Sequence, residues 1–223
     1  MKRQKIPVSL EILADMETPL SVYKKLANKP FSYLFESVEG GEKWARYSLI
    51  GLPCSKVIKV YNKQIQIFKY GKIEEEIIVS DPLEFLENYH EETKVKFDDE
   101  LPMFTGGLVG YLGYDCIGYI EPRLSNSSLP DPLGTPDALF LVSEEVAVFD
   151  NLNNKLHLIV LSESESEADV SKAEERLKTL SKKLTSPLNY KTQEEIRDAV
   201  AEKDFVSGFG EKQFKQSIKK IKE

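Results

Sequence analysis

A β-hairpin is predicted by the stretch Leu34-Phe35-Glu36-Ser37-Val38-Glu39-Gly40-Gly41-Glu42-Lys43-Trp44-Ala45-Arg46-Tyr47-Ser48-Leu49-Ile50-Gly51. The apolar runs at 31–38 and 47–52 have the composition of strands, and the glycine pair between them marks a turn. Strands joined in this way are antiparallel neighbours in a sheet. We therefore expect the chain to be built around antiparallel pairing.

The facing ends of this hairpin carry side chains suited to a small zwitterion with an aromatic body. The carboxylate of Glu36 can meet an ammonium group, and Arg46 can meet a carboxylate. The ring of Trp44 or Tyr47 can cover an aromatic ring of the ligand. The alternative is an ordinary hairpin with a charged, solvated rim, in which Arg46 pairs with an acidic residue of the turn at little gain.

Outward from the hairpin, strands and helices alternate in groups. Further strands are predicted in a meander at 56–79 and, beyond it, at 104–112, 138–149 and 155–161. Helices are predicted at 18–28, from residue 81 onward, at 114–121 and at 165–184. Thr18 and Asp81 each precede a proline, which is typical of a helix start. Strand groups without a βαβ glycine fingerprint indicate an α+β fold with largely antiparallel sheets.

Four glycines punctuate the strand predicted at 104–112 and the residues after it: Gly106, Gly107, Gly110 and Gly113. Their spacing is neither that of a dinucleotide-binding loop nor that of a Walker loop. A glycine-studded strand more often marks the close approach of another backbone. We expect a packing role here and no phosphate site.

Composition narrows the functional classes. The 223 residues are 41% hydrophobic and 30% charged, which is ordinary for a globular protein with a core of one large or two small domains. The net charge is −7 and basic residues are interleaved with acidic ones, so nucleic-acid binding is disfavoured. The sequence contains neither an apolar stretch of membrane length nor a signal core after Met1, and we expect a cytoplasmic protein.

Cysteine and histidine are scarce. Cys54 and Cys116 lie far apart without metal-ligand spacing, and we expect both to be buried free thiols. The only histidines are His90 and His157, which makes a histidine-based metal site or a Ser-His-Asp triad improbable.

Four segments together resemble component I, the large subunit, of anthranilate synthases, within the chorismate-utilising enzyme family. They occur in the same order as in that family, at 18–26, 34–51, 106–115 and 137–150. The resemblance implies two sheets packed together with helices on the outside. It also implies that the full subunit converts chorismate and ammonia to anthranilate and pyruvate with Mg²⁺. A glutamine amidotransferase subunit, component II, supplies the ammonia in this family.

The same resemblance implies an allosteric site for L-tryptophan, the end product of the pathway. The family's Leu-x-Glu-Ser motif matches Glu36 and Ser37, and a second part of the pocket matches Arg46, Tyr47 and Ser48. We therefore predict these five residues as tryptophan-binding. We predict no catalytic residue and no metal ligand in this chain.

The resemblance also implies the domain organisation. Residues 1–203 correspond to the N-terminal regulatory domain with a C-terminal linker, and 204–223 to the beginning of the chorismate-binding domain. The catalytic carboxylates and magnesium ligands of the family lie beyond this stretch, so we expect a truncated, catalytically inactive portion. Two features depart from the family: Gly118 replaces a common arginine, and Asp150-Asn151 replaces the usual Asp-His.

Two alternative functions remain open. One is component I of aminodeoxychorismate synthase, the folate-pathway relative, although the acid-serine-Gly-Gly pattern at 36–41 favours the anthranilate branch. The other is a stand-alone amino-acid-binding regulatory module. The segment at 205–214, which resembles the start of the chorismate-binding domain, argues against it.

Overall fold

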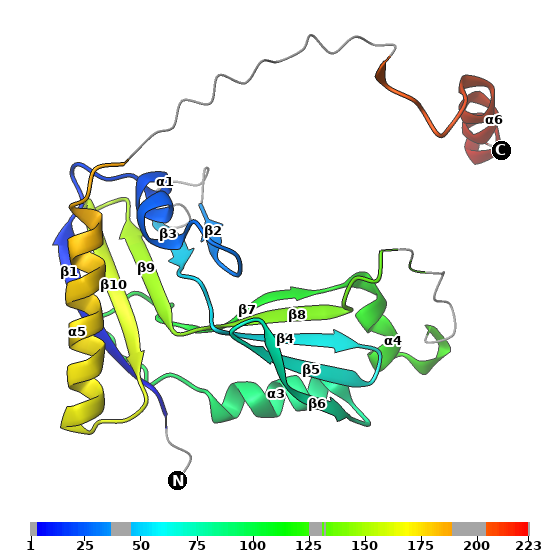
Figure 1. The fold of residues 1–223 in the computed structure, drawn as a ribbon. Helices are drawn as coiled ribbons and strands as arrows, with labels where there is room; N and C mark the ends of the chain where they lie inside the picture. Colours follow the sequence, from blue (N-terminus) through cyan, green and yellow to red (C-terminus); the bar gives the residue numbers. More distant parts are fainter. Residues whose placement is uncertain (1–3, 37–45, 125–130, 132, 189–203, 223) are drawn as a thin grey trace. The chain divides into compact units, whose positions relative to one another are not determined.

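The computed structural model describes residues 4–36, 46–124, 131, 133–188 and 204–222. The chain divides into two compact units, Met1–Leu188 and Asn189–Glu223. The first unit contains every strand that the structure describes (Figure 1).

Two five-stranded sheets form the first unit, and every neighbouring pair of strands is antiparallel. In spatial order, the first sheet contains β1 (Ile6–Leu13), β10 (Lys155–Ser162), β9 (Glu145–Asp150), β3 (Tyr47–Gly51) and β2 (Tyr33–Phe35). The second contains β6 (Lys72–Ile78), β5 (Gln64–Lys69), β4 (Lys56–Tyr61), β8 (Ala138–Ser143) and β7 (Gly107–Leu112). The predicted α+β class with antiparallel sheets is confirmed.

The helices begin where the sequence supplies caps. Thr18 Oγ1 accepts a hydrogen bond from the backbone N–H of Ser21, and Asp81 and Ser166 cap their helices in the same way. The helices of the first unit are α1 (Pro19–Val22), which continues as η1 (Tyr23–Ala27), α3 (Pro82–Glu92), η2 (Tyr114–Cys116), α4 (Ile117–Ile120), η3 (Pro122–Leu124) and α5 (Glu167–Leu184). In the second unit, α6 covers Glu211–Lys222.

The side chains of each strand alternate between its two faces, and the apolar side chains on the facing sides form a core between the two sheets. Val57 and Leu141 of the second sheet pack with Val146, Val148 and Ile159 of the first in one buried cluster. Because successive strand residues point to opposite faces, the neighbours of these residues are directed to the outer faces.

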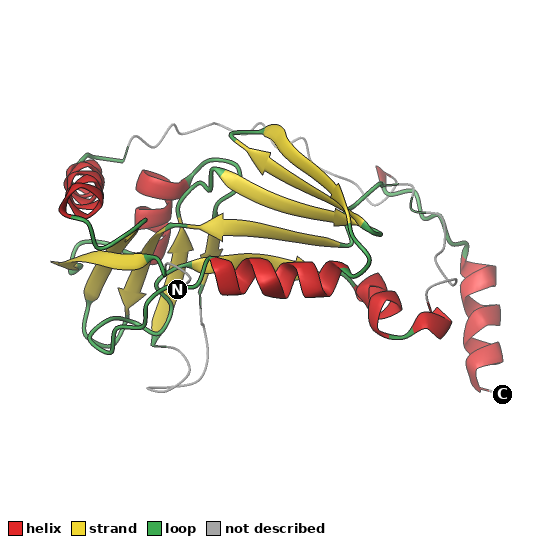
Figure 2. Ribbon diagram, turned by 90° about the horizontal axis from the view of Figure 1, so that it is seen from below, coloured by secondary structure: helices red, strands yellow, loops and turns green. Residues whose placement is uncertain are grey.

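Helices cover the outer faces of both sheets (Figure 2). On the first sheet, Leu177 and Leu180 of α5 belong to a cluster with Leu158 of β10. On the second, Leu86 of α3 packs with Ile58 of β4. Full burial of such a side chain contributes about 1.5–3 kcal/mol, so these helices are held by their apolar faces. The predicted layering, with helices outside two packed sheets, is confirmed.

The prediction of a single strand at 138–149 is wrong. The segment forms two strands, β8 and β9, which belong to different sheets and are separated by Glu144. Both strands are apolar and largely buried, so hydrophobicity alone did not mark the change of sheet. Strand β1 was not predicted from the sequence, and the strand predicted at 104–112 begins at Gly107.

Both cysteines are free thiols, with Cys116 buried and Cys54 half-buried. Burial raises the pKa of the Cys54 thiol to about 11, so this thiol is unreactive at neutral pH. No helix in the part of the chain that the structure describes is long and apolar enough to cross a membrane.

The glycine-rich strand makes the close backbone approach that its spacing predicts. A Cβ atom on Gly110 would lie 1.8 Å from the carbonyl oxygen of Leu139 in the neighbouring strand β8. The β7–β8 pair therefore has no room for a side chain at this position.

Gly110→Ala should force β7 away from β8 and lower the free energy of unfolding by at least about 2 kcal/mol. The measurement is the midpoint of urea denaturation. Gly208→Ala is the matched control, because a Cβ there would meet no atom within 4 Å. Equal midpoints for the two variants would contradict the close approach.

Candidate functional site

The predicted site residues that the structure describes lie at one end of the first sheet. β3 begins there and β9 turns into β10, and the register places Tyr47 opposite Asp150. Asp150 is only 2% exposed, although it is charged. A buried carboxylate needs compensating partners, so its surroundings define the chemistry of this end.

Asp150 is surrounded by hydrogen-bond donors. Arg46 donates from Nη2 at 2.7 Å and from Nε at 3.2 Å, and Asn153 donates from Nδ2 at 2.9 Å. The backbone N–H groups of Leu152 and Asn153 donate at 3.1 and 3.2 Å. Burial alone would raise the pKa of Asp150, but these bonds outweigh it and lower the pKa to about 2. Asp150 is therefore ionised at neutral pH.

Arg46 is held in place by this carboxylate. Its guanidinium carbon lies 4.8 Å from the centre of the Tyr47 ring, and the hydrogen bonds to Asp150 raise the pKa of Arg46. The side chain remains 37% exposed. Its bonds to Asp150 use Nε and Nη2, so Nη1 can donate to a bound carboxylate.

Tyr47 and Ser48 point to opposite faces of the sheet. Tyr47 packs against the cluster between the sheets. Ser48 pairs in register with Phe149, whose side chain belongs to the cluster on the helix side. The Ser48 side chain is buried, and its hydroxyl accepts a hydrogen bond of 3.2 Å from Asn151 Nδ2. The structure thus groups Tyr47 with Arg46 and separates Ser48 from them.

The other half of the predicted site follows β2. Glu36 is exposed immediately after this strand. Phe35, the last residue of β2, is 52% exposed, and its ring centroid lies 5.2 Å from that of Tyr33. Ser37 and Trp44 lie outside the described residues. The described part of the site therefore offers a carboxylate, a guanidinium and aromatic rings at this end of the sheet.

Several titratable groups on the adjoining strands were not predicted from the sequence. Lys155 Nζ lies 2.7 Å from a carboxylate oxygen of Glu11, and His157 Nε2 lies 4.0 Å from the other. Burial lowers the pKa of His157. Asp150 was noted only as part of a dipeptide that departs from the family. The turn composition after it, Asn-Leu-Asn-Asn, was the available signal for a carboxylate that binds backbone N–H groups.

The described residues contain no group of three or more His, Cys, Asp or Glu side chains that could hold a metal ion.

Comparison with known proteins agrees with this fold. The family model for chorismate binding enzymes matches residues 31–223. Anthranilate synthase component 1 of Pseudomonas aeruginosa is 44% identical over 220 residues, and that of Neisseria meningitidis serogroup B is 43% identical over 226 residues. A crystal structure of anthranilate synthase component I from Streptococcus pneumoniae TIGR4 has a TM-score of 0.50 and 29% identity, covering 80% of this chain and 37% of that one.

The chain belongs to the family of chorismate binding enzymes. Within it, the chain is similar to component I of anthranilate synthases over 98% of its own length. It spans 45% of the Pseudomonas relative and 44% of the Neisseria relative.

The Asp150 network makes stability depend on pH. Its pKa is lowered from 3.8 to about 2, so ionised Asp150 stabilises the fold above about pH 4, and this contribution is lost as the pH falls toward 2. At pH 7, Asp150→Asn should lower the free energy of unfolding by about 2 kcal/mol. The difference in unfolding free energy between this variant and the wild type should be smaller at pH 3, as measured by urea denaturation.

Asp99→Asn is the matched control, because Asp99 is exposed on a surface connection. Its unfolding free energy should equal that of the wild type at pH 7. A pH-independent loss in Asp150→Asn would mean that the carboxylate charge is not what stabilises this end of the sheet.

Proposed function

We propose that this chain forms the N-terminal, regulatory portion of component I of an anthranilate synthase. The observation that carries the proposal is the 44% identity to a component 1 relative over 98% of the chain. The proposed reaction of the complete subunit is the conversion of chorismate and ammonia to anthranilate and pyruvate. The proposed source of ammonia is a glutamine amidotransferase subunit, component II, that binds component I.

The proposed ligand of the candidate site is L-tryptophan, acting as feedback inhibitor. Arg46, held by Asp150, would bind the carboxylate through its remaining N–H groups. Glu36 would bind the ammonium group, and the ring of Tyr47 would form part of the wall for the indole. Ser37 would contact the ligand beside Glu36, as the sequence motif predicts.

Ser48 has a different proposed role in the same site. Its hydroxyl is occupied by Asn151, and its side chain is buried on the helix side of the sheet. Ser48 would therefore act by holding the turn that carries Asp150 and Asn153, which in turn orients Arg46.

Inhibition at this site requires a difference in affinity between two states. Tryptophan can shift the subunit toward an inactive arrangement only if it binds that arrangement more tightly than the active one. The role of this portion is thus to supply ligand contacts whose geometry differs between the two arrangements. The proposed Mg²⁺ supports the chorismate reaction of the complete subunit, and no described cluster in this chain is assigned to it.

The complete subunit supplies the direct test. It should be incubated with chorismate, Mg²⁺ and ammonium, with and without tryptophan, and the product identified by chromatography and fluorescence. We expect anthranilate, at a rate that tryptophan suppresses. The 223-residue chain alone should form none.

Other outcomes of that assay would overturn the proposal. Aminodeoxychorismate formed without suppression by tryptophan would assign the chain to the folate branch. Tryptophan binding without any turnover would indicate a stand-alone regulatory module.

Ser37→Phe in the complete subunit tests the site itself. A phenyl group in place of the hydroxyl should fill the pocket and prevent tryptophan binding by overpacking. The ratio of rates with and without tryptophan should approach one. Ser186→Phe, at an exposed position outside the site, is the control and should stay inhibited. Unchanged inhibition in Ser37→Phe would remove Ser37 from the pocket.

A further inference from the structure

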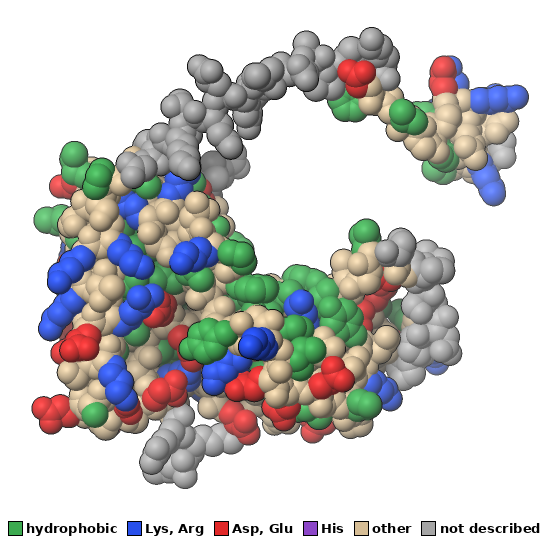
Figure 3. All heavy atoms as spheres, in the orientation of Figure 1, with side chains coloured by type: hydrophobic (Ala, Val, Ile, Leu, Met, Phe, Trp, Pro, Cys, Tyr) green, Lys and Arg blue, Asp and Glu red, His purple; other side chains and the backbone are tan. Residues whose placement is uncertain are grey.

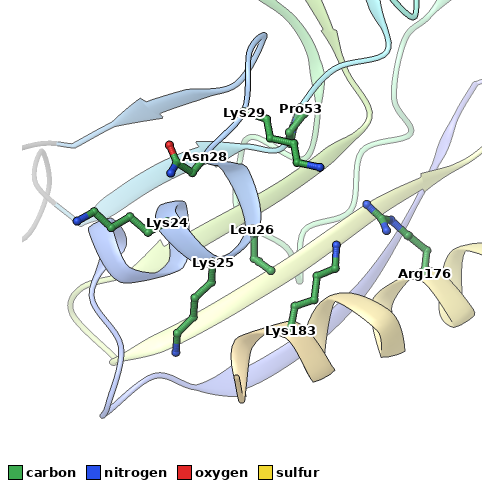
Figure 4. Close-up of a pocket in the computed structure, with 8 residues that line it drawn as sticks. All are labelled: Lys24, Lys25, Leu26, Asn28, Lys29, Pro53, Arg176 and Lys183. Atoms are coloured by element: carbon green, nitrogen blue, oxygen red, sulfur yellow. The ribbon is translucent and has the colours of Figure 1, made fainter. Parts of the chain in front are cut away.

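A cavity in the first unit lies away from the candidate tryptophan site, between η1 and α5. It has a volume of about 290 Å³, and the described residues that line it include five basic side chains and no acidic one (Figure 4). The lining residues are Lys24, Lys25, Leu26, Asn28, Lys29, Pro53, Arg176 and Lys183. Such a concentration of positive charge is unexpected in a chain with a net charge of −7.

Two of the basic residues are neutralised by carboxylates outside the lining. Lys25 forms an ion pair with Glu17, and its Nζ also donates to the Leu184 carbonyl at 2.7 Å. Arg176 donates from Nε and Nη2 to the two carboxylate oxygens of Glu145, each at 2.7 Å. These contacts fix the two side chains in place and account for their charge.

Lys29 and Lys183 have no such partner within the described part of the chain. Figure 4 shows both side chains directed toward the space that Arg176 also faces. The three cations come from two parts of the chain, since Lys29 follows η1 and both Arg176 and Lys183 lie on α5. The ammonium groups of Lys29 and Lys183 repel each other, and an anion bound between them would offset this repulsion.

Helix electrostatics explain only part of this arrangement. Lysine in the last turn of a helix is favoured by the helix dipole, which accounts for Lys183 at the end of α5. The dipole of α5 does not account for Lys29, which lies on a different segment. Figure 3 shows lysine and arginine side chains gathered on this face of the first unit.

We propose that this cavity is a binding site for a small oxyanion, a phosphate or a carboxylate group. Lys29 and Lys183 supply mobile ammonium donors, and Arg176 supplies a guanidinium whose orientation is fixed by Glu145. The fixed guanidinium gives the site its geometry, and the lysines give it most of its charge. The proposal is independent of the function proposed above.

The test is thermal unfolding of the full 223-residue chain at increasing concentrations of sodium phosphate. Sodium chloride at matched ionic strength removes the effect of general screening. A ligand that binds only the folded state raises stability in proportion to ln(1 + [L]/Kd), which yields an apparent Kd. A parallel titration with malonate distinguishes a preference for carboxylate from a preference for phosphate.

The double variant Lys29→Gln with Lys183→Gln removes the two charges that have no carboxylate partner among the described residues. Both positions are exposed, so the fold should tolerate it. We expect its apparent Kd for the preferred anion to rise at least about tenfold. Lys63→Gln with Lys178→Gln removes the same charge from exposed positions outside the cavity and should leave the Kd unchanged.

Two results would overturn the proposal. One is stabilisation by phosphate and malonate no greater than that by chloride. The other is an equal loss of binding in both double variants, which would indicate a response to overall charge and no defined site.

Discussion

The chain passes from one sheet to the other at Glu144, and the packing of the first unit depends on this passage. Ser143 ends β8 and Glu145 begins β9, so the two sheets must meet at this corner. Ser143 is fully buried there, and its hydroxyl shares a 2.9 Å hydrogen bond with the hydroxyl of Tyr33. A buried hydroxyl without a partner would cost about 1–3 kcal/mol. Lys5, just before β1, forms an ion pair with Glu144 and so links the start of β1 to this corner.

Structural features that depend on residues close together in the sequence were predictable, whereas the pairing of strands far apart in the sequence was not. Thr18 and Asp81 identified two helix starts because capping depends on residues two or three positions away. The pattern at 56–79 identified the meander because β4 and β5 each keep a buried apolar face, although β6 is largely exposed. At 138–149, hydrophobicity persists while the hydrogen-bond partners change from β4 and β7 to β3 and β10. Local composition does not record such a change of partner.

The candidate site shows the same division. Arg46 and Tyr47 were predicted as site residues because their chemistry suits a zwitterionic ligand, and in the structure the Arg46 guanidinium lies against the Tyr47 ring. Asp150 was missed because its importance comes from a partner 104 residues away along the chain. The adjacent placement of Tyr47 and Ser48 in sequence suggested a shared role, but strand geometry directs them to opposite faces. Residues that are adjacent in a sequence motif can therefore lie on opposite faces of a sheet when the motif forms a strand.

Strand β9 carries a carboxylate at each end, and each carboxylate orients an arginine. Asp150 at its end orients Arg46, and Glu145 at its beginning orients Arg176. At about 3.4 Å per residue, the two carboxylates are separated by roughly 17 Å of one buried strand. Groups this far apart normally contribute additively to stability. Any departure from additivity between changes at the two ends would thus measure the free energy of coupling between the two ends of β9.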